Sequence, residues 1–202
     1  WVYKSPYSLV IGKNNFIDNN QPGSYNATGL NSVLGDYNEL RTGTSNFVAG
    51  SYHKVSEGGS NFVGGAVNHI GHTFTTKERN ANKSPSGSNG SQYYYWNTAF
   101  GYYNRIKNDT GTPSTSGVSY SFVAGNANKI EVSRGVALGT HAYAGGNIRF
   151  AIGVNDSITT TTAYPDANSN KFVIDKDGNV GIGTESPESA LQVLGTLDGS
   201  PD

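Results

Sequence analysis

Oxygen-bearing side chains that could hold a divalent cation stand close together in the sequence DKDGN at residues 175–179. Alternating ligands such as Asp175, Asp177 and Asn179 begin the calcium loop of EF-hand proteins. That loop needs glycine at its sixth position and a distant glutamate, whereas Val180 stands sixth here. Asp-Gly-Asn is also favourable turn chemistry for a β-hairpin. The sequence therefore predicts a hairpin turn, and we expect no metal and no cofactor.

Histidines and carboxylates elsewhere could support metal binding or glycan cleavage. The four histidines, His53, His69, His72 and His141, lack the spacing of metal ligands. Glycan cleavage needs two carboxyl groups about 5–9 Å apart, one of them with a raised pKa. Most of the 15 acidic residues stand at expected turns or at outward positions of a repeat. We therefore expect no enzyme, with glycan hydrolysis by an acid pair between subunits as the open alternative.

Aromatic side chains suited to recognition end a polar stretch that begins at His72. Tyrosine and tryptophan give large, rigid contact surfaces with a polar group, and sugar rings stack on aromatic faces. These aromatics either form a strand that packs on the rest of the fold, which we slightly prefer, or contact a receptor. The candidate receptor-binding or glycan-binding residues are Tyr93, Tyr94, Tyr95, Trp96, Tyr102 and Tyr103.

A repeat centred on glycine occupies most of the chain. Its period is 14–15 residues, and insertions at 18–30, 71–96 and 107–120 interrupt it. Such a length suits two short strands and two turns, which make one coil of a parallel β-roll. The eight copies are SLVIG-KNNFI (8–17), NSVLG-DYNEL (31–40), NFVAG-SYHKV (46–55), NFVGG-AVNHI (61–70), NTAFG-YYNRI (97–106), SFVAG-NANKI (121–130), GVALG-THAYA (135–144) and RFAIG-VNDSI (149–158).

The strand before the glycine is predicted to be buried on both faces. The residue two positions before the glycine is always small and apolar, as a tight interior requires. On the opposite face a large residue is matched with a small one, as at Phe47 with Ala49 and at Phe62 with Gly64. Close packing produces such volume compensation. Since one coil can cover only one face of its own strand, we predict that another chain covers the other.

The strand after the glycine is predicted to have one solvated face. Apolar residues five positions after the glycine form an inward column, and charged residues such as Lys54 and Arg105 precede them. Asparagine recurs three positions after the glycine, as at Asn38, Asn68 and Asn104. These asparagines could stack into a hydrogen-bonded ladder or occupy left-handed turns, and we prefer the turn.

Composition narrows the classes of partner. A formal net charge of −1 gives no electrostatic attraction to nucleic acid or to an anionic membrane. No apolar run approaches the roughly 18 residues of a membrane-spanning helix. The absence of Cys removes disulfides and thiolate chemistry. The expected partners are other copies of the chain and an external receptor, with no nucleic acid and no membrane insertion.

Several short segments of the sequence resemble segments of fibrous proteins. The sequences NSVLG (31–35) and VALG (136–139) are similar to head repeats of trimeric autotransporter adhesins, which form a left-handed parallel β-roll shared by three chains. NTAFGYYN (97–104) resembles related repeats of bacteriophage tail fibres. FVIDKDGNVGIGTESPESALQVLG (172–195) resembles a segment of phage tail fibres and tailspikes that commonly precedes a self-cleaving intramolecular chaperone domain. Within this segment we predict a hairpin and, after Pro187, a short helical turn.

The resemblance implies an all-β, homotrimeric, left-handed parallel β-roll with loop insertions. The expected parts are the roll at 1–158, a linker at 159–170 and a C-terminal hairpin segment at 171–202, which precedes a cleaved or absent chaperone. The implied function is structural and receptor-binding: a phage tail fibre of the virion that adheres to a bacterial surface glycan or protein. The alternatives are the head of a bacterial trimeric adhesin at the cell surface, a polysaccharide depolymerase tailspike, and a pure fibre spacer.

Overall fold

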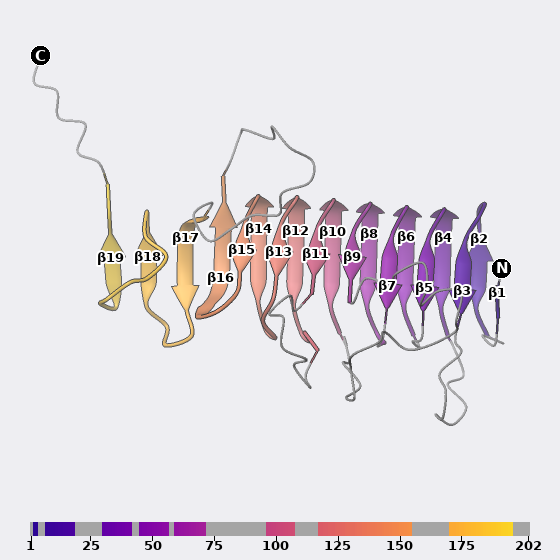
Figure 1. Cartoon of the computed structure of the whole chain (residues 1–202), viewed down its shortest axis with the longest axis horizontal. Helices are drawn as coiled ribbons and strands as arrows, with labels where there is room; N and C mark the ends of the chain where they lie inside the picture. Colours follow the sequence, from indigo (N-terminus) through magenta and orange to yellow (C-terminus); the bar gives the residue numbers. More distant parts are fainter. Residues whose placement is uncertain are drawn as a thin grey trace, which may run out of the picture.

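The chain folds into strands stacked along one long axis (Figure 1). The structure is a computed structural model, and its described part contains strands, turns and no helix. The all-β, mostly parallel, roll-like architecture predicted from the sequence is confirmed. The described residues are 2–3, 7–18, 30–41, 45–56, 59–71, 96–107, 117–154 and 170–195.

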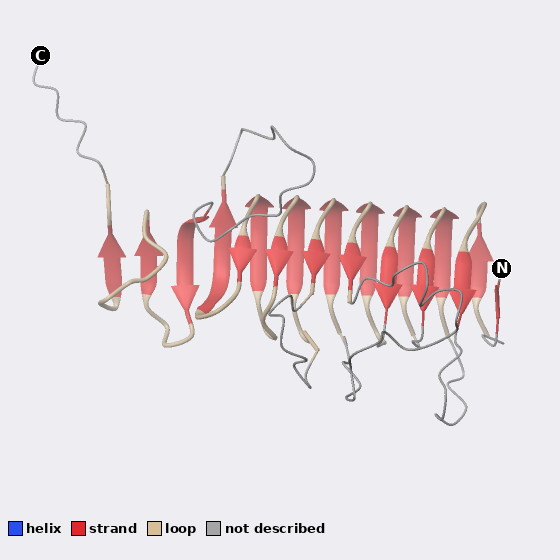
Figure 2. Ribbon diagram, viewed as in Figure 1, coloured by secondary structure: helices blue, strands red, loops and turns tan. Residues whose placement is uncertain are grey.

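Two sheets face each other, and the short strands run opposite to the parallel long strands beside them, from β2 to β16 (Figure 2). The longer strands form an 11-stranded sheet: β2 (Leu9–Ile11), β4 (Ser32–Asp36), β6 (Phe47–Ser51), β8 (Phe62–Ala66), β10 (Thr98–Tyr102), β12 (Phe122–Asn126), β14 (Val136–Thr140), β16 (Ile148–Gly153), β17 (Asn170–Asp175), β18 (Val180–Ile182) and β19 (Leu191–Val193). The shorter strands form an 8-stranded sheet: β1 (Val2–Tyr3), β3 (Phe16–Asp18), β5 (Glu39–Arg41), β7 (Lys54–Ser56), β9 (His69–Ile70), β11 (Arg105–Ile106), β13 (Lys129–Ile130) and β15 (Tyr143–Ala144).

The glycine that recurs in the long strands from β4 to β16 keeps adjacent coils in register. Gly50 lies opposite Gly65, Gly65 opposite Gly101, and Gly101 opposite Gly125, so the register passes the insertions at 71–96 and 107–120 without a slip. These glycines have positive φ, and a Cβ on Gly101 would collide with the carbonyl oxygen of Gly125 in the next coil. The close approach of the two backbones therefore requires glycine at this position.

Two apolar columns, one from each sheet, fill the interior. Every side chain in them is at most 3% exposed, as the two inward columns of the sequence pattern predict. The long strands contribute Val33, Val48, Val63, Ala99, Val123, Ala137 and Ala151, and the short strands contribute Ile17, Leu40, Val55, Ile70, Ile106, Ile130 and Ala144.

The outer face of the 11-stranded sheet is apolar and partly exposed in the single chain. Phe62, Phe100 and Phe122 are 40%, 39% and 38% exposed. Volume compensation on this face has a cause within the chain, because a Cβ on Gly64 would lie 2.9 Å from the ring of Phe100. Phe100 pairs with Gly64 across β10 and β8. The large residue therefore fills the space left by a small residue of the adjacent coil, and compensation by itself does not require a second chain.

The C-terminal hairpin extends the 11-stranded sheet. β17 pairs antiparallel with β16 and with β18, so the predicted hairpin is confirmed and is continuous with the roll. Asn170, placed in the linker by the sequence, is the first residue of β17, and residues 159–169 lie outside the described part. The helical turn expected after Pro187 is wrong, because the described chain there has no helix and continues into β19, which pairs parallel with β18.

Candidate functional site: the corners of the roll

Each coil turns between the sheets at two corners built on the same local pattern. A residue with positive φ, near +60°, is followed by a buried residue, which is Asn, His or Ser at ten of these corners and Ala142 or Gly135 at the other two. The corner after the long strand uses Asn14, Tyr37, Tyr52, Val67, Tyr103, Ala127 and His141 in this conformation. The corner before the long strand uses Ser45, Ser60, Trp96, Tyr120 and Arg134. The recurrent asparagines follow these residues, so our preference for asparagine itself as the left-handed residue is wrong.

The asparagines form a buried, hydrogen-bonded ladder. The backbone N–H of Asn104 donates to Oδ1 of Asn68 at 3.0 Å, and that of Asn128 donates to Oδ1 of Asn104 at 3.1 Å. Each side chain thus satisfies backbone groups of the next coil, which would otherwise be buried without partners. The ladder that we ranked second from the sequence is what the structure contains.

A second ladder stands at the corner before the long strand, and sequence reasoning missed it. Asn46 donates its backbone N–H to Oδ1 of Asn31 at 3.1 Å, and Asn61 donates likewise to Asn46 at 3.2 Å. The signal was present, because asparagine stands four positions before the glycine in NSVLG, NFVAG, NFVGG and NTAFG. In this region two hydrogen-bonded ladders, one at each corner, therefore connect each coil to the next.

His53 replaces asparagine at one rung of the first ladder. Its Nδ1 accepts the backbone N–H of Asn68 at 3.2 Å, and its Nε2 lies 3.2 Å from the carbonyl oxygen of Ala49. These partners fix the neutral tautomer that carries its proton on Nε2. Burial lowers the pKa of the imidazole below its ordinary value. His53 therefore has a structural role in the ladder.

The other histidines do not gather into a metal site with His53. His69 lies in β9, His141 occupies a corner, and His72 lies outside the described residues. Across the part of the chain that the structure describes, no group of three or more His, Cys, Asp or Glu residues could hold a metal ion.

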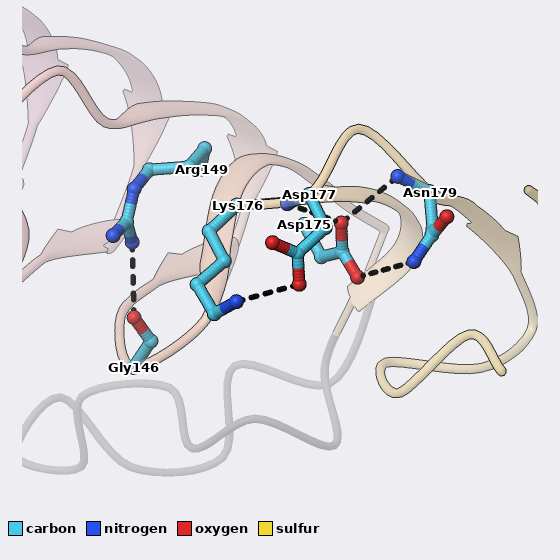
Figure 3. A network of polar contacts seen from close by, with 6 residues as sticks. All are labelled: Gly146, Arg149, Asp175, Lys176, Asp177 and Asn179. Carbon is cyan, nitrogen blue, oxygen red and sulfur yellow. Dashed lines mark hydrogen bonds and ion pairs between the residues drawn. The ribbon is translucent and has the colours of Figure 1, made fainter.

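The DKDGN sequence forms the turn between β17 and β18 (Figure 3). Oδ1 of Asp175 accepts the backbone N–H groups of Asp177 at 2.9 Å and Asn179 at 2.8 Å, and Oδ2 accepts Nδ2 of Asn179 at 3.1 Å. Desolvation would raise the pKa of Asp175, but these hydrogen bonds outweigh it and hold the pKa below its ordinary value. The carboxylate is occupied by its own turn, as the hairpin interpretation predicts.

Trp96 and Tyr120 form an exposed stack on one edge of the roll. We call this edge the insertion edge and define it by the corner residues Ser45, Ser60, Trp96, Tyr120 and Arg134. The two rings lie 4.9 Å apart at an angle of 15°, and they are 54% and 57% exposed. All three predicted insertions run from the end of a short strand to the start of a long strand, which is this edge. Tyr93, Tyr94 and Tyr95 lie outside the described residues.

Tyr102 and Tyr103 lie at the opposite end of β10, so the structure does not bring all six predicted aromatics together. Their rings are 6.0 Å apart and tilted by 31°. On the same edge, Tyr37 and Tyr52 stack at 4.9 Å with an angle of 2° between rings. We call this the tyrosine edge and define it by Tyr37, Tyr52, Tyr102 and Tyr103. Sequence reasoning missed the first two, although they stand two positions after the glycine, as Tyr103 does.

Comparison of the chain with protein-family models, curated proteins and solved structures found no match. Among the described residues, no helix is long and apolar enough to cross a membrane.

Proposed function

We propose that this chain is a structural and receptor-binding segment of a homotrimeric phage tail fibre, located in the virion, that adheres to a bacterial surface. The observation that carries the proposal is the apolar outer face of the 11-stranded sheet. From β4 to β16, the positions three and one before the glycine hold no charged residue. They include Leu34, Phe47, Phe62, Phe100, Phe122, Val136, Leu138, Phe150 and Ile152. A contiguous apolar surface that is partly exposed on the single chain marks a protein interface.

A second copy of the chain is the occupant that fits this face. The ring centroids of Phe47 and Phe62 are 4.7 Å apart. The row continues with Phe100, whose ring is 5.2 Å from that of Phe62, and with Phe122, whose ring is 6.5 Å from that of Phe100. The row repeats at the coil spacing of about 4.8 Å along the axis. A second copy that runs parallel has the same spacing, so its phenylalanine rings can lie level with those of the first copy along the whole row. The number three and the phage origin rest on the resemblance of the repeats and of residues 172–195.

The solution mass tests the assembly. We expect the chain to have the mass of three copies by light scattering and native mass spectrometry. Phe62→Lys with Phe100→Lys should give single chains, because charges cannot be buried in an apolar interface. Ser45→Lys with Ser60→Lys adds the same charge at exposed corners and should leave the mass unchanged. Circular dichroism checks that each variant is folded. A folded monomeric parent, or a face variant that stays trimeric, would overturn the proposal.

Adhesion to bacteria tests receptor binding. Three copies present three identical sites, so weak contacts combine through avidity. We expect fluorescently labelled fibre segments to bind host cells, and Trp96→Ala with Tyr120→Ala to abolish binding while the trimer mass is kept. Undiminished adhesion of that variant would remove the insertion edge from the proposal. An absence of adhesion by the parent on a panel of bacteria would reduce the segment to a spacer.

A further inference from the structure

We propose that the C-terminal strands β17, β18 and β19 pack against the same strands of the other copies and fix how far one copy is displaced along another. This inference rests on the proposed function, because it takes the outer face of the 11-stranded sheet as the contact between copies. It adds a separate role for the C-terminal segment, which is to set the axial register of the assembly.

The apolar outer face of the roll continues without interruption to the last strand. Strand pairing aligns the outer residues of β16, β17, β18 and β19 in two rows, and every member of both rows is apolar. One row is Phe150, Ile174, Val180 and Leu191, and the other is Ile152, Phe172, Ile182 and Val193. We define the hairpin face by the members on the last three strands, which are Phe172, Ile174, Val180, Ile182, Leu191 and Val193.

The hairpin face is on the same side of the sheet as the apolar face of the roll. The residues that alternate with it, Ala151, Val173 and Gly181, pair with one another and are buried on the opposite side. The rings of Phe150 and Phe172 lie 5.8 Å apart where the roll meets the hairpin. The two faces therefore form one continuous surface.

The far end of this surface is its most exposed part. Leu191 and Val193 are 61% and 60% exposed, compared with 38–40% for Phe62, Phe100 and Phe122 on the roll. In the part of the chain that the structure describes, the 8-stranded sheet ends at β15, so the last three strands extend the other sheet alone. A sheet with an apolar face must bury that face against another layer.

A second copy of the chain supplies this layer by geometry. Copies that run parallel and pack level through the roll face also bring their hairpin faces together, because the roll and the hairpin belong to one sheet. No charged residue stands in either row, so the contact buries no charge.

The roll face alone does not fix the displacement between copies. Its strands are parallel and repeat at about 4.8 Å, so a shift by one coil again places strand beside strand. The hairpin breaks this repeat, because β17 runs antiparallel to β16 whereas β14 and β16 are parallel. A shift by one coil also leaves Leu191 and Val193 of one copy beyond the end of the other. Level copies therefore bury the whole hairpin face, and shifted copies do not.

Thiol labelling tests the contact, because the chain has no Cys of its own. We expect Val193→Cys to react with a maleimide at least about tenfold more slowly in the assembly than in single chains carrying Phe62→Lys with Phe100→Lys, since a buried thiol is inert. Lys176→Cys, in the exposed turn between β17 and β18, is the matched control and should react equally fast in both. A Val193→Cys thiol that reacts as fast as this control in the assembly, or is protected equally in single chains, would overturn the contact.

Distances between spin labels test the register. Chains labelled at Ser45→Cys are assembled with chains labelled at Lys176→Cys, so that labels on different chains are six strand steps apart along the axis, from β6 to β17, or roughly 29 Å. We expect one narrow distance for the parent hairpin. Ile182→Asn with Val193→Asn should split it by up to about 5 Å, because copies shifted by one coil then become populated. Ser186→Asn with Ala190→Asn adds the same side chains at exposed positions of this segment and should keep one distance.

The outcomes separate this inference from the proposed function. A parent with the mass of three copies and an unprotected Val193→Cys thiol overturns the hairpin contact and leaves the proposed assembly. If the Phe62→Lys with Phe100→Lys variant stays assembled and Val193→Cys is protected in it, the roll face is removed from the proposal and the hairpin contact stands. An unsplit distance for Ile182→Asn with Val193→Asn overturns the register role. Single chains from that variant overturn it too, because the hairpin would then hold the copies together and not merely align them.

Discussion

Replacing Asn104 with alanine tests whether the buried ladder holds adjacent coils together. Its Nδ2 donates to the carbonyls of Phe100 at 2.8 Å and Gly125 at 2.9 Å, and to Oδ1 of Asn68 at 3.0 Å. Its Oδ1 accepts the backbone N–H of Asn128. Alanine removes all of these bonds. It leaves the Asn128 N–H buried without its acceptor, while two backbone carbonyls lose a donor.

The expected cost follows from those groups. An orphaned buried donor costs about 1–3 kcal/mol, and each of the two lost hydrogen bonds to a carbonyl costs about 0.5–1.5 kcal/mol. We therefore expect Asn104→Ala to lower the free energy of unfolding by about 2–6 kcal/mol. Tryptophan fluorescence during urea unfolding measures it, at one fixed protein concentration because assembly shifts the midpoint.

Asn126 supplies the matched control for this experiment. It is the last residue of β12, two positions before Asn128, and its side chain is not part of the ladder. Asn126→Ala should change the free energy of unfolding by no more than about 0.5 kcal/mol. A cost below about 1 kcal/mol for Asn104→Ala would refute the reasoning, because the glycine column and apolar core would then hold the coils without the ladder.

Three further predictions concern other parts of the fold. Burial lowers the pKa of His53 below 6.5, so the unfolded chain binds a proton that the folded chain does not. The free energy of unfolding should therefore fall as the pH drops below about 6.5. His53→Asn should remove that part of the loss, which a comparison of urea midpoints at about pH 8 and about pH 5 measures. In Gly125→Ala the new Cβ collides with the Gly139 carbonyl, and the free energy of unfolding should fall by at least about 3 kcal/mol. Gly146 also has positive φ but has nothing within 4 Å of its Cβ position, so Gly146→Ala should cost about 1–2 kcal/mol. Equal costs for the two variants would show that only φ matters. Asp175→Ala should open the β17–β18 turn, and unchanged amide exchange at Asn179 would contradict this role.

The sequence predicts those parts of the fold that depend on one strand at a time. Alternation around the glycine identifies Val63 and Ile70 as interior residues, and the DKDGN turn predicts the hairpin. The role of Gly64 could not be predicted in the same way, because it depends on Phe100, which follows an insertion and becomes a neighbour only through the register of β8 and β10. Likewise, the stacking of Tyr37 on Tyr52 follows from the stacking of coils, and neither residue belongs to the aromatic run at 93–96 that we considered for receptor binding.

The corners show why residue type misled the assignment of left-handed turns. In an isolated turn the residue with positive φ is selected to be glycine or asparagine, because nothing else offsets its cost. Here the N–H of Tyr52 is bonded to the preceding coil, and the side chain of the residue that follows the turn bonds the next coil, as Oδ1 of Asn38 does to His53 N–H at 3.1 Å. The ladder fixes the backbone, so the residue before it can be tyrosine, valine or alanine. At both aromatic stacks its side chain is at least half exposed, so we expect a change there to leave the register undisturbed. Both aromatic stacks lie at such positions, which makes the corners the part of the coil where recognition can vary while the fold is kept.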